Sequence, residues 1–412
     1  MQENKNAYKT ISEVAKEIDL PDLETILIIF KQPRWVHEFV TSKFSLNYKV
    51  EYIYISNLIK KNNKEIIKLI NTTIENKKIS IALFEGDHVS IINFDFINSI
   101  KVKKKGLFLW DDFMYHEINE ITAKACDFIL SACPYSSLKF KKKGHQSLFL
   151  PMESDGNVFK KYENIQKKND VLFFGSANRH RRPYINYIRD NGINIKHVSR
   201  ENPATRSPHG LAKVINESKI VINFSKAEFL KRVYFGSKKY KNYYQFKGRI
   251  YQTGLCGTAC ITEYSPAHDL IFKDDELISF KTKEECVKIL KKILNDSKTL
   301  ENYSKKFHQK CLEFDDKNYI KKIIQFFESI KFNSSNVKTS KYFPFWYKWI
   351  FIKQRLWLRY RSGNFTSFFK EVFDIIFLSK NNSFLGYLLF PLYSLFYSLI
   401  FLIRWSLKKL KF

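Results

Sequence analysis

Several short apolar runs in the second half of this sequence end in small, polar or charged residues. Gly175 and Ser176 follow one run, Asn223 and Ser225 close another, and Glu263 closes a third. In open α/β sheets, ligands bind outside the carboxyl ends of the strands. These residues are therefore expected to bring exposed amides, small side chains and one carboxylate together at one edge of a sheet.

Arginines accompany these strand ends. Arg182 lies where a helix is expected to begin, in "NRHRRP" (178–183), and Arg249 opens the expected helix 249–257. Free backbone N–H groups at a helix start bind anions, and a guanidinium holds phosphate through two hydrogen bonds. Singly, each feature is more often a turn or a solvated charge run. Together they predict a pyrophosphate site.

Glu263 is an acidic side chain among these basic residues. A carboxylate beside phosphate-binding cations suffers no conflict with the ligand if it faces the hydroxyl groups of a sugar. The ribose-binding acid of dinucleotide domains works in this way. The alternative is a carboxylate that caps a helix or stabilises a loop. Glu263 taken alone favours this alternative, and the sugar-binding interpretation depends on the family resemblance of the surrounding segments.

The elements that must position these residues form two successive strand–helix alternations. Strands are expected at 25–30, 50–56, 79–86, 105–111, 127–132 and 147–152, and again at 170–176, 193–199, 219–225 and 258–263. These runs are continuously apolar, which is typical of parallel strands buried on both faces. Helices are expected between them, including 57–77, 115–125, 181–192, 209–218 and 282–296. The sequence predicts an α/β protein with two tandem Rossmann-like domains, 1–155 and 156–330.

The composition narrows the class of protein. The 412 residues are 44% hydrophobic and 27% charged, which is typical of a globular chain with more than one domain. Six cysteines show neither metal-binding spacing nor a disulfide framework, and the polar first residues do not resemble a signal peptide. We therefore expect a reducing cytoplasm. The net charge of +29 indicates anionic partners, although a lysine-rich solvated surface is an equal alternative for the body of the protein.

The last part of the chain, 331–412, has a different character. It holds 14 Lys and Arg residues against two acidic residues, and from 341 onward Trp, Tyr and Phe alternate with these cations. Such mixtures are typical of a membrane interface with anionic lipid. Residues 384–403 carry no charge but include Pro391, and cations flank them on both sides. A helical tail inserted monotopically is predicted, with one transmembrane helix or a buried core helix as alternatives.

Four segments in order carry a resemblance to a known family. They are "VLFFGSANRHRRPYINYI", "LAKVINESKIVINFS", "GRIYQTGLCGTACITE" and "HDLIFKDDELISFKTKEECVKILKKIL". This succession resembles the nucleotide-binding half of GT-B glycosyltransferases of group 1, most closely the branch that includes the spore-maturation protein CgeB. With "GLFLWDDFMYHEI" and "CDFILSACPYSSLKFKKKGHQSLFLPM", the resemblance covers roughly 105–330. It implies a GT-B fold and a nucleotide-sugar donor.

The resemblance also implies roles for individual residues. Residues near the donor would be Asn223 and Ser225 of the "NFS" strand end, Arg249, Glu263 and Glu276. The sequence departs from the family pattern at Gln252, where the family has a glutamate, and at Asp275, where it has a glycine. Donor preference is therefore open. Residues 226–247 form a basic, tyrosine-rich insertion that is expected to lie over the cleft.

A GT-B enzyme binds the donor in its second domain and the acceptor in its first. No DxD motif is positioned to hold Mg²⁺, so a metal-independent enzyme without a cofactor is expected, in which cations and helix N-termini neutralise the leaving diphosphate. An inverting enzyme needs a base for the acceptor hydroxyl. The candidates are Asp87, His88, Asp112 and His116. A retaining enzyme needs none, and the sequence does not choose between the two.

The combined expectation is a glycosyltransferase that moves a sugar from a nucleotide-sugar to a glycan or lipid-linked acceptor in cell-envelope glycan biosynthesis. It would lie at the cytoplasmic face of the plasma membrane, peripheral or monotopic, with residues 341–412 on anionic lipid. The alternative is a catalytically inactive GT-B-like membrane scaffold or nucleic-acid-binding protein, which Gln252 and the basic insertion would fit. Nucleic acid is the less expected partner, because a twenty-residue apolar run does not serve it.

Overall fold

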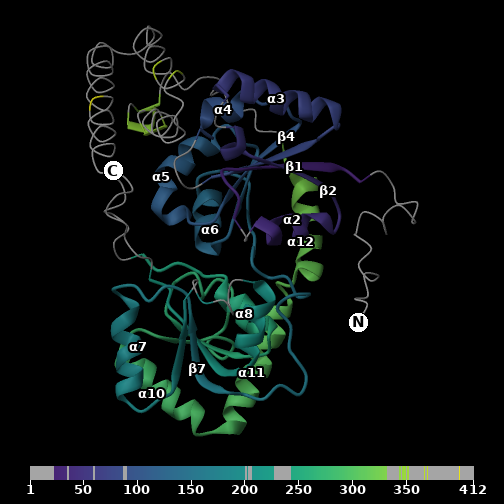
Figure 1. Ribbon diagram of the computed structural model, residues 1–412. Coiled ribbons are helices and arrows are strands. Elements are labelled where there is room, and N and C mark those ends of the chain that lie inside the picture. Colours follow the sequence, from purple (N-terminus) through teal and green to yellow (C-terminus); the bar gives the residue numbers. More distant parts are fainter. Residues whose placement is uncertain are drawn as a thin grey trace, which may run out of the picture.

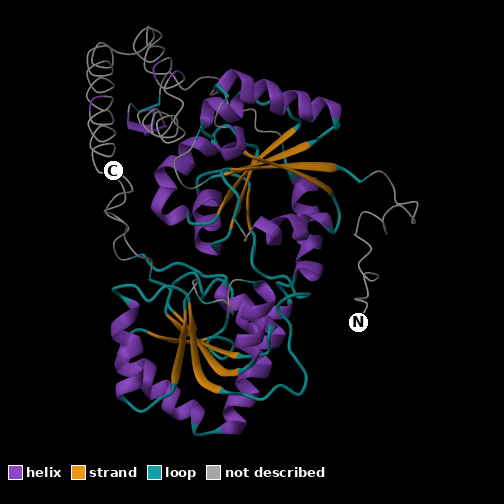
Figure 2. Ribbon diagram, in the orientation of Figure 1, coloured by secondary structure: helices purple, strands orange, loops and turns teal. Residues whose placement is uncertain are grey.

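The described part of the chain forms two open α/β units, one above the other in Figure 1. The computed structural model describes residues 23–34, 37–58, 61–86, 91–199, 202, 207–226, 243–331 and a few positions between 343 and 399. In each unit, helices cover both faces of a parallel sheet (Figure 2). The predicted α/β class with two parallel sheets is confirmed.

The first sheet has six parallel strands in the order β2-β1-β3-β4-β5-β6. The strands are β1 Thr25–Phe30, β2 Lys49–Tyr54, β3 Ile81–Glu85, β4 Lys104–Leu109, β5 Phe128–Ser131 and β6 Ser147–Phe149, and the helices are α2 His37–Ser45, α3 Asn63–Asn76, α4 Phe94–Asn98, α5 Asp112–Ala123 and α6 Pro134–Lys142. Every residue of β1 and β3 is buried, as continuous apolar runs predict for central parallel strands. The chain order reverses between these two strands.

The second sheet has five parallel strands in the order β11-β10-β9-β7-β8. The strands are β7 Asn169–Phe174, β8 Ile195–Val198, β9 Ser218–Asn223, β10 Ala259–Glu263 and β11 Ile278–Phe280, and the helices are α7 Arg181–Asp190, α8 Pro208–Asn216, α9 Arg249–Leu255, α10 Lys283–Leu294, α11 Ser297–Leu312 and α12 Asp316–Ser329. Here the order reverses between β7 and β9. Ligands of doubly wound sheets bind at such reversals, outside the carboxyl ends of the strands.

Two helical regions differ from the sequence-based expectation. The expected helix 57–77 is divided into a 3₁₀ turn, Ile55–Leu58, and α3, because Asn62 and Glu65 form a capping box that starts a new helix. Helix α2 was not predicted. Its inward face carries a fully buried lysine, Lys43, which interrupts the apolar pattern that would have revealed it.

The last helix of the second alternation, α12, packs on the first unit beside α2 (Figure 1). The Phe327 ring stacks on Phe44 at 6.1 Å, and Lys104 Nζ donates to the Phe327 carbonyl at 2.8 Å. Tyr319 donates its hydroxyl to the Phe149 carbonyl at 2.6 Å. The chain therefore crosses between the units twice, before β7 and again before α12.

A buried polar cluster joins these two crossings. Lys43 Nζ donates to Asp316 Oδ1 and, at 3.0 Å, to Ser154 Oγ. The Gly156 amide donates to Asp315 at 3.0 Å. Burial lowers the pKa of Lys43 and raises the pKa of Asp316, because the cost of desolvation exceeds their mutual attraction. The pair specifies the geometry of the crossing more than it adds net stability.

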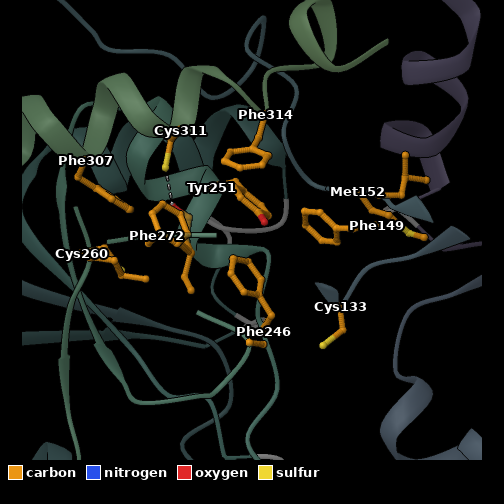
Figure 3. Close-up of a cluster of buried hydrophobic side chains, with 14 of the residues drawn as sticks. Cys133, Phe149, Met152, Phe246, Tyr251, Cys260, Phe272, Phe307, Cys311 and Phe314 are labelled. Carbon is orange, nitrogen blue, oxygen red and sulfur yellow. Dashed lines mark hydrogen bonds between the residues drawn. The ribbon is translucent and has the colours of Figure 1, made fainter. Parts of the chain in front are cut away.

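Aromatic side chains complete this junction (Figure 3). The ring of Phe149, at the end of β6, lies 6.2 Å from Tyr251, 6.1 Å from Phe246 and 6.3 Å from Phe314. Met152 lies beside it in the same cluster. The end of the first sheet and the core of the second unit thus share one continuous hydrophobic cluster.

The described residues between 343 and 351, together called segment 343–351, lie against α4 and α5. The Tyr347 hydroxyl accepts from the Phe94 amide at 3.0 Å and lies 3.0 Å from Thr122 Oγ1. Tyr347 and Phe351 are buried. Most of the predicted membrane tail, including 384–403 apart from Leu399, lies outside the described residues. Within the described part, no helix is both long and apolar enough to cross a bilayer.

The buried pair gives a stability prediction. Lys43→Met should lower the free energy of unfolding by about 3–5 kcal/mol, because it leaves the Asp316 carboxylate buried without its cation. Urea unfolding followed by circular dichroism measures the change.

The matched control is Lys306→Met, which removes a lysine from the exposed pair with Asp275 and should leave the unfolding midpoint unchanged. A double variant, Lys43→Met with Asp316→Leu, should recover most of the lost stability. Equal midpoints for Lys43→Met and the unsubstituted protein would contradict the assigned role.

Candidate functional site

A cavity of about 850 Å³ lies between the carboxyl edges of the two sheets. Residues of both units form its walls. From the first unit these are Pro33, Arg34, Trp110, Asp111, Ala132, Met152 and Glu153, and from the second they include Phe174, Gly175, Ser176, Arg181, Val198, Ser199, Leu211, Gln245, Lys247, Arg249 and Gln252. Four of the lining side chains are cationic and two are carboxylates. The cavity therefore favours an anionic ligand.

Gly175 makes room for a guanidinium at the end of β7. Its φ is +123°, and a Cβ at this position would lie 2.6 Å from Arg249 Nη2. Arg249 opens α9, and its Nη1 donates to Asn223 Oδ1 at 3.3 Å. Its guanidinium also covers the Phe173 and Phe174 rings at 5.7 and 5.6 Å. The strand ends of β7 and β9 thus fix one cation in the cavity wall.

Two further cations line the same wall. Arg181, at the start of α7, donates from Nη1 to the Ser176 carbonyl at 2.9 Å. Lys247 Nζ donates to Gln245 Oε1, and burial lowers the pKa of Lys247 to about 8, with Arg249 and Arg181 adding repulsion and Asp111 opposing the shift. An anion that entered here would relieve this repulsion, so the wall is suited to bind a polyanion.

The opposite wall belongs to the first unit and carries an indole and a carboxylate. Trp110 and Asp111 follow β4. Gln245 spans the cleft, because its Nε2 donates to the Trp110 carbonyl at 3.1 Å and to Asp111 Oδ1 at 3.0 Å. Tyr243 also stacks on Phe113 at 5.1 Å. The end of the predicted insertion 226–247 thus lies in the cleft, whereas 227–242 lie outside the described residues.

Six of the nine predicted donor residues lie in the cavity wall or directly behind it. Gly175, Ser176, Arg249 and Gln252 line the cavity. Asn223 and Ser225 are buried behind them, where Asn223 Nδ2 donates to Thr262 Oγ1 at 2.8 Å and orients Arg249. Asn223 therefore positions a cavity side chain.

The cavity wall holds Arg181 in place of the predicted Arg182. Arg182 is exposed and does not line the cavity, whereas Arg181 is buried in its wall. The burial of Arg181 could have been predicted from the sequence, because it shares a helical spacing with Ile185 and Ile188, the other buried residues of α7.

Glu263 is buried and both its oxygens have protein partners. His180 Nε2 lies 2.7 Å from Oε1, and the Lys226 amide donates to Oε2 at 2.8 Å. Glu263 does not line the cavity. The carboxylate ties the ends of β9 and β10 to the start of α7, which is the structural alternative that the sequence left open.

Two of the four proposed bases are buried away from the cavity. Asp112 Oδ2 lies 2.7 Å from His116 Nδ1 and accepts from Ser136, while Asp112 Oδ1 accepts from Asn119 Nδ2 at 2.9 Å. These bonds lower the pKa of Asp112 despite its burial. The pair joins α5 to α6, so the structure does not place it beside an acceptor. Asp87 and His88 lie outside the described residues.

Glu276 also lies apart from the cavity. It precedes β11, and its Oε2 accepts from the Lys273 amide at 2.9 Å in a turn. A residue before a parallel strand lies at the amino edge of the sheet, opposite the carboxyl edge that forms the cleft.

The residues that the sequence missed are Asp111, Gln245 and Lys247. Asp111 had a usable signal, since it directly ends an apolar run.

Two parallel sheets whose carboxyl edges face one cavity define the GT-B fold. Sucrose-phosphate synthase from Thermosynechococcus elongatus is similar with a TM-score of 0.51 and 9% identity, over 74% of this chain and 98% of that one. Anabaena HepE in complex with UDP and glucose gives 0.50 and 11%, over 74% and 100%. At these identities the likeness establishes the fold alone.

Residues 164–326 match the family model described as Glycosyl transferase-like. No curated protein matches the sequence. The resemblance to GT-B glycosyltransferases is thus confirmed, and these matches support a transferase. The narrower likeness to the CgeB branch stays a prediction.

The close approach of the Arg249 guanidinium to Gly175 gives a testable prediction. Gly175→Ala should weaken UDP binding by roughly ten- to a hundredfold, because the added Cβ displaces the Arg249 guanidinium and removes a charged hydrogen bond. Isothermal titration calorimetry measures the change. Gly192→Ala is the matched control, since Gly192 also has a positive φ of +79° but no atom within 4 Å of the new Cβ. Equal losses in both variants would show that backbone strain alone was responsible.

Proposed function

We propose that this protein is a metal-independent glycosyltransferase that binds a nucleotide-sugar in the cavity. The observation that carries the proposal is the wall formed by Arg181, Lys247 and Arg249, which gathers three cations from one unit opposite a carboxylate of the other. A leaving diphosphate is the anion that such a wall would stabilise. The matched family and the GT-B fold support the same reaction class.

The diphosphate would lie against the three cations, with Gly175 allowing its close approach. Cations fixed before the reaction stabilise developing charge without reorganisation, which is the role that Mg²⁺ has in other transferases. The nucleoside would extend toward Val198, Ser199 and Leu211 on the same unit. HepE was solved with UDP and glucose, so UDP-glucose is the first donor to test.

The acceptor would enter from the first unit, between Arg34, Trp110 and Asp111. Indole rings pack on sugar faces, and a carboxylate orients a hydroxyl by accepting its hydrogen bond. Asp111 therefore takes the place that the sequence gave to Asp112 and His116. Whether it also removes the hydroxyl proton depends on the stereochemical course, for which both alternatives stay open.

The acceptor that fits the C-terminal sequence is a lipid-linked glycan. A tail with 14 cations and an uncharged run of twenty residues would hold the enzyme at the cytoplasmic face of the plasma membrane. Confinement of enzyme and acceptor to one surface raises their effective concentration. Segment 343–351 packs on the acceptor-side unit, which is consistent with this arrangement.

The lowered pKa of Lys247 gives a pH dependence. With a pKa near 8, Lys247 is cationic at pH 7 and loses its proton as the pH rises. A diphosphate binds the charged form and raises this pKa, so UDP affinity should fall by roughly tenfold for each unit above pH 8. Calorimetric titrations between pH 7 and 10 measure it.

Lys247→Arg provides the control, because arginine stays charged over this range and should flatten the profile between pH 8 and 10. EDTA should leave UDP affinity unchanged in both proteins. If no nucleoside diphosphate binds at pH 7, the proposed function is wrong.

Asp111 gives the corresponding prediction for the acceptor side. Asp111→Asn should lower the rate of sugar release from UDP-glucose by at least tenfold, because an amide holds the attacking hydroxyl or water less strongly. UDP affinity should change much less than the rate when it is measured at pH 6, where Lys247 stays charged although Asp111 no longer supports its pKa. Glu153→Gln alters the other lining carboxylate and should have a smaller effect. An unchanged rate in Asp111→Asn would remove Asp111 from the reaction.

A further inference from the structure

A second hollow lies on the outer face of the first unit, away from the cavity. It is a shallow groove between α3 and the residues after α4, and it is lined by Lys64, Ile67, Lys68, Asn71, Thr72, Ile74, Glu75, Ser99 and Lys101. Lys64 and Lys68 are one helical turn apart and both are exposed. Three lysines thus face one carboxylate, Glu75. None of the three forms an ion pair with another described residue.

The groove is held in shape by one amide side chain. Asn71 Oδ1 accepts from the Lys101 amide at 2.8 Å, and Asn71 Nδ2 donates to the Ser99 carbonyl at 3.2 Å. These two bonds fix the loop after α4 against α3. Lys101 is thereby kept in the lining of the groove that Lys64 and Lys68 also form.

The C-terminal segment reaches the same face at the other end of α4. Tyr347 accepts the hydrogen bond of the Phe94 amide, one of the N–H groups that the start of a helix leaves without an internal partner. Thr122 Oγ1 donates to the Ile118 carbonyl, so the Tyr347 hydroxyl donates to Thr122. Because α4 has only five residues, the two ends of the helix, one at the groove and one at the segment, lie about 7–8 Å apart.

The docked segment divides its side chains between the domain and the outside. Tyr347 and Phe351 are buried, and Phe343 stacks edge-on with Phe94 at 4.7 Å. Trp346 is 36% exposed on the outside. Indole rings at a protein surface beside lysines are typical of contact with lipid headgroups. The basic-aromatic tail continues from this point.

We propose that the face formed by α3, α4 and segment 343–351 lies on the membrane, with an anionic lipid headgroup in the groove between Lys64, Lys68 and Lys101. Charge complementarity selects the headgroup, and the attached tail supplies the hydrophobic anchor. The acceptor-side unit is thereby oriented on the bilayer. This inference rests on the membrane attachment in the proposed function and adds the surface and the lipid class.

Vesicle flotation with the full chain tests the surface. The groove variant is Lys64→Gln, Lys68→Gln and Lys101→Gln, and the matched control is Lys288→Gln, Lys292→Gln and Lys298→Gln on α10 and α11 at the far end of the second unit (Figure 1). Both remove three charges from exposed positions. On vesicles of phosphatidylcholine with 30% phosphatidylglycerol, the groove variant should lose on the order of a hundredfold in partition coefficient, and the control less than threefold.

Two further readouts decide the interpretation. Asn71→Ala should lose part of the affinity without any change of charge, because it releases Lys101 from α3. On pure phosphatidylcholine all proteins should bind equally, and UDP binding should be unchanged in every variant. Equal losses in the two triple variants, or loss of RNA binding with unchanged vesicle binding, would overturn the lipid site. A failure of UDP binding in the unsubstituted protein would instead count against the proposed function.

Discussion

One buried ion pair determines how the two halves of this molecule meet. Lys43 extends from α2 into a fully buried site and contacts Asp316 at the start of α12 and Ser154 in the connection between the sheets. Both crossings of the chain are therefore tied to a single ammonium group. Buried charges need close partners in a fixed geometry, whereas apolar contacts tolerate sliding. The aromatic cluster around Phe149 supplies the contact area between the two units, and the ion pair determines their registry, that is, how one unit is positioned on the other.

That registry matters because neither half contains a complete site. The cations that favour a diphosphate come from the second unit, and the carboxylate and indole that suit an acceptor come from the first. Gln245 touches both, through Asp111 on one side and Lys247 on the other. A change in the angle between the sheets would separate charges that lie within hydrogen-bond reach of one bridging amide. The chemistry of the cleft thus depends on the Lys43–Asp316 pair, which does not itself line the cavity.

The sequence predicted the strands well, because central parallel strands are buried on both faces and must be continuously apolar. It failed where burial and polarity coincide. Helix α2 was missed because Lys43 faces inward, and Asp112 was preferred over Asp111 although only the structure shows which of two adjacent carboxylates turns into the core. Arg181 could have been recognised from its spacing with Ile185 and Ile188. Gln245 and Lys247 could not, since neither an apolar period nor a strand end marks them in the sequence.

The same long-range contacts have a consequence for biosynthesis. The last strand of the first sheet ends at Phe149. The partner of Lys43, Asp316, lies 273 residues further along the chain, and the partner of the Phe94 amide, Tyr347, lies 253 residues further along. Contacts of such separation form late, because loop closure must precede them. On the ribosome, the second unit can complete its own sheet before the first unit receives its last helix. The half of the protein that is made first is therefore expected to finish folding last, and until then solvent must hydrate Lys43 and the Phe94 amide.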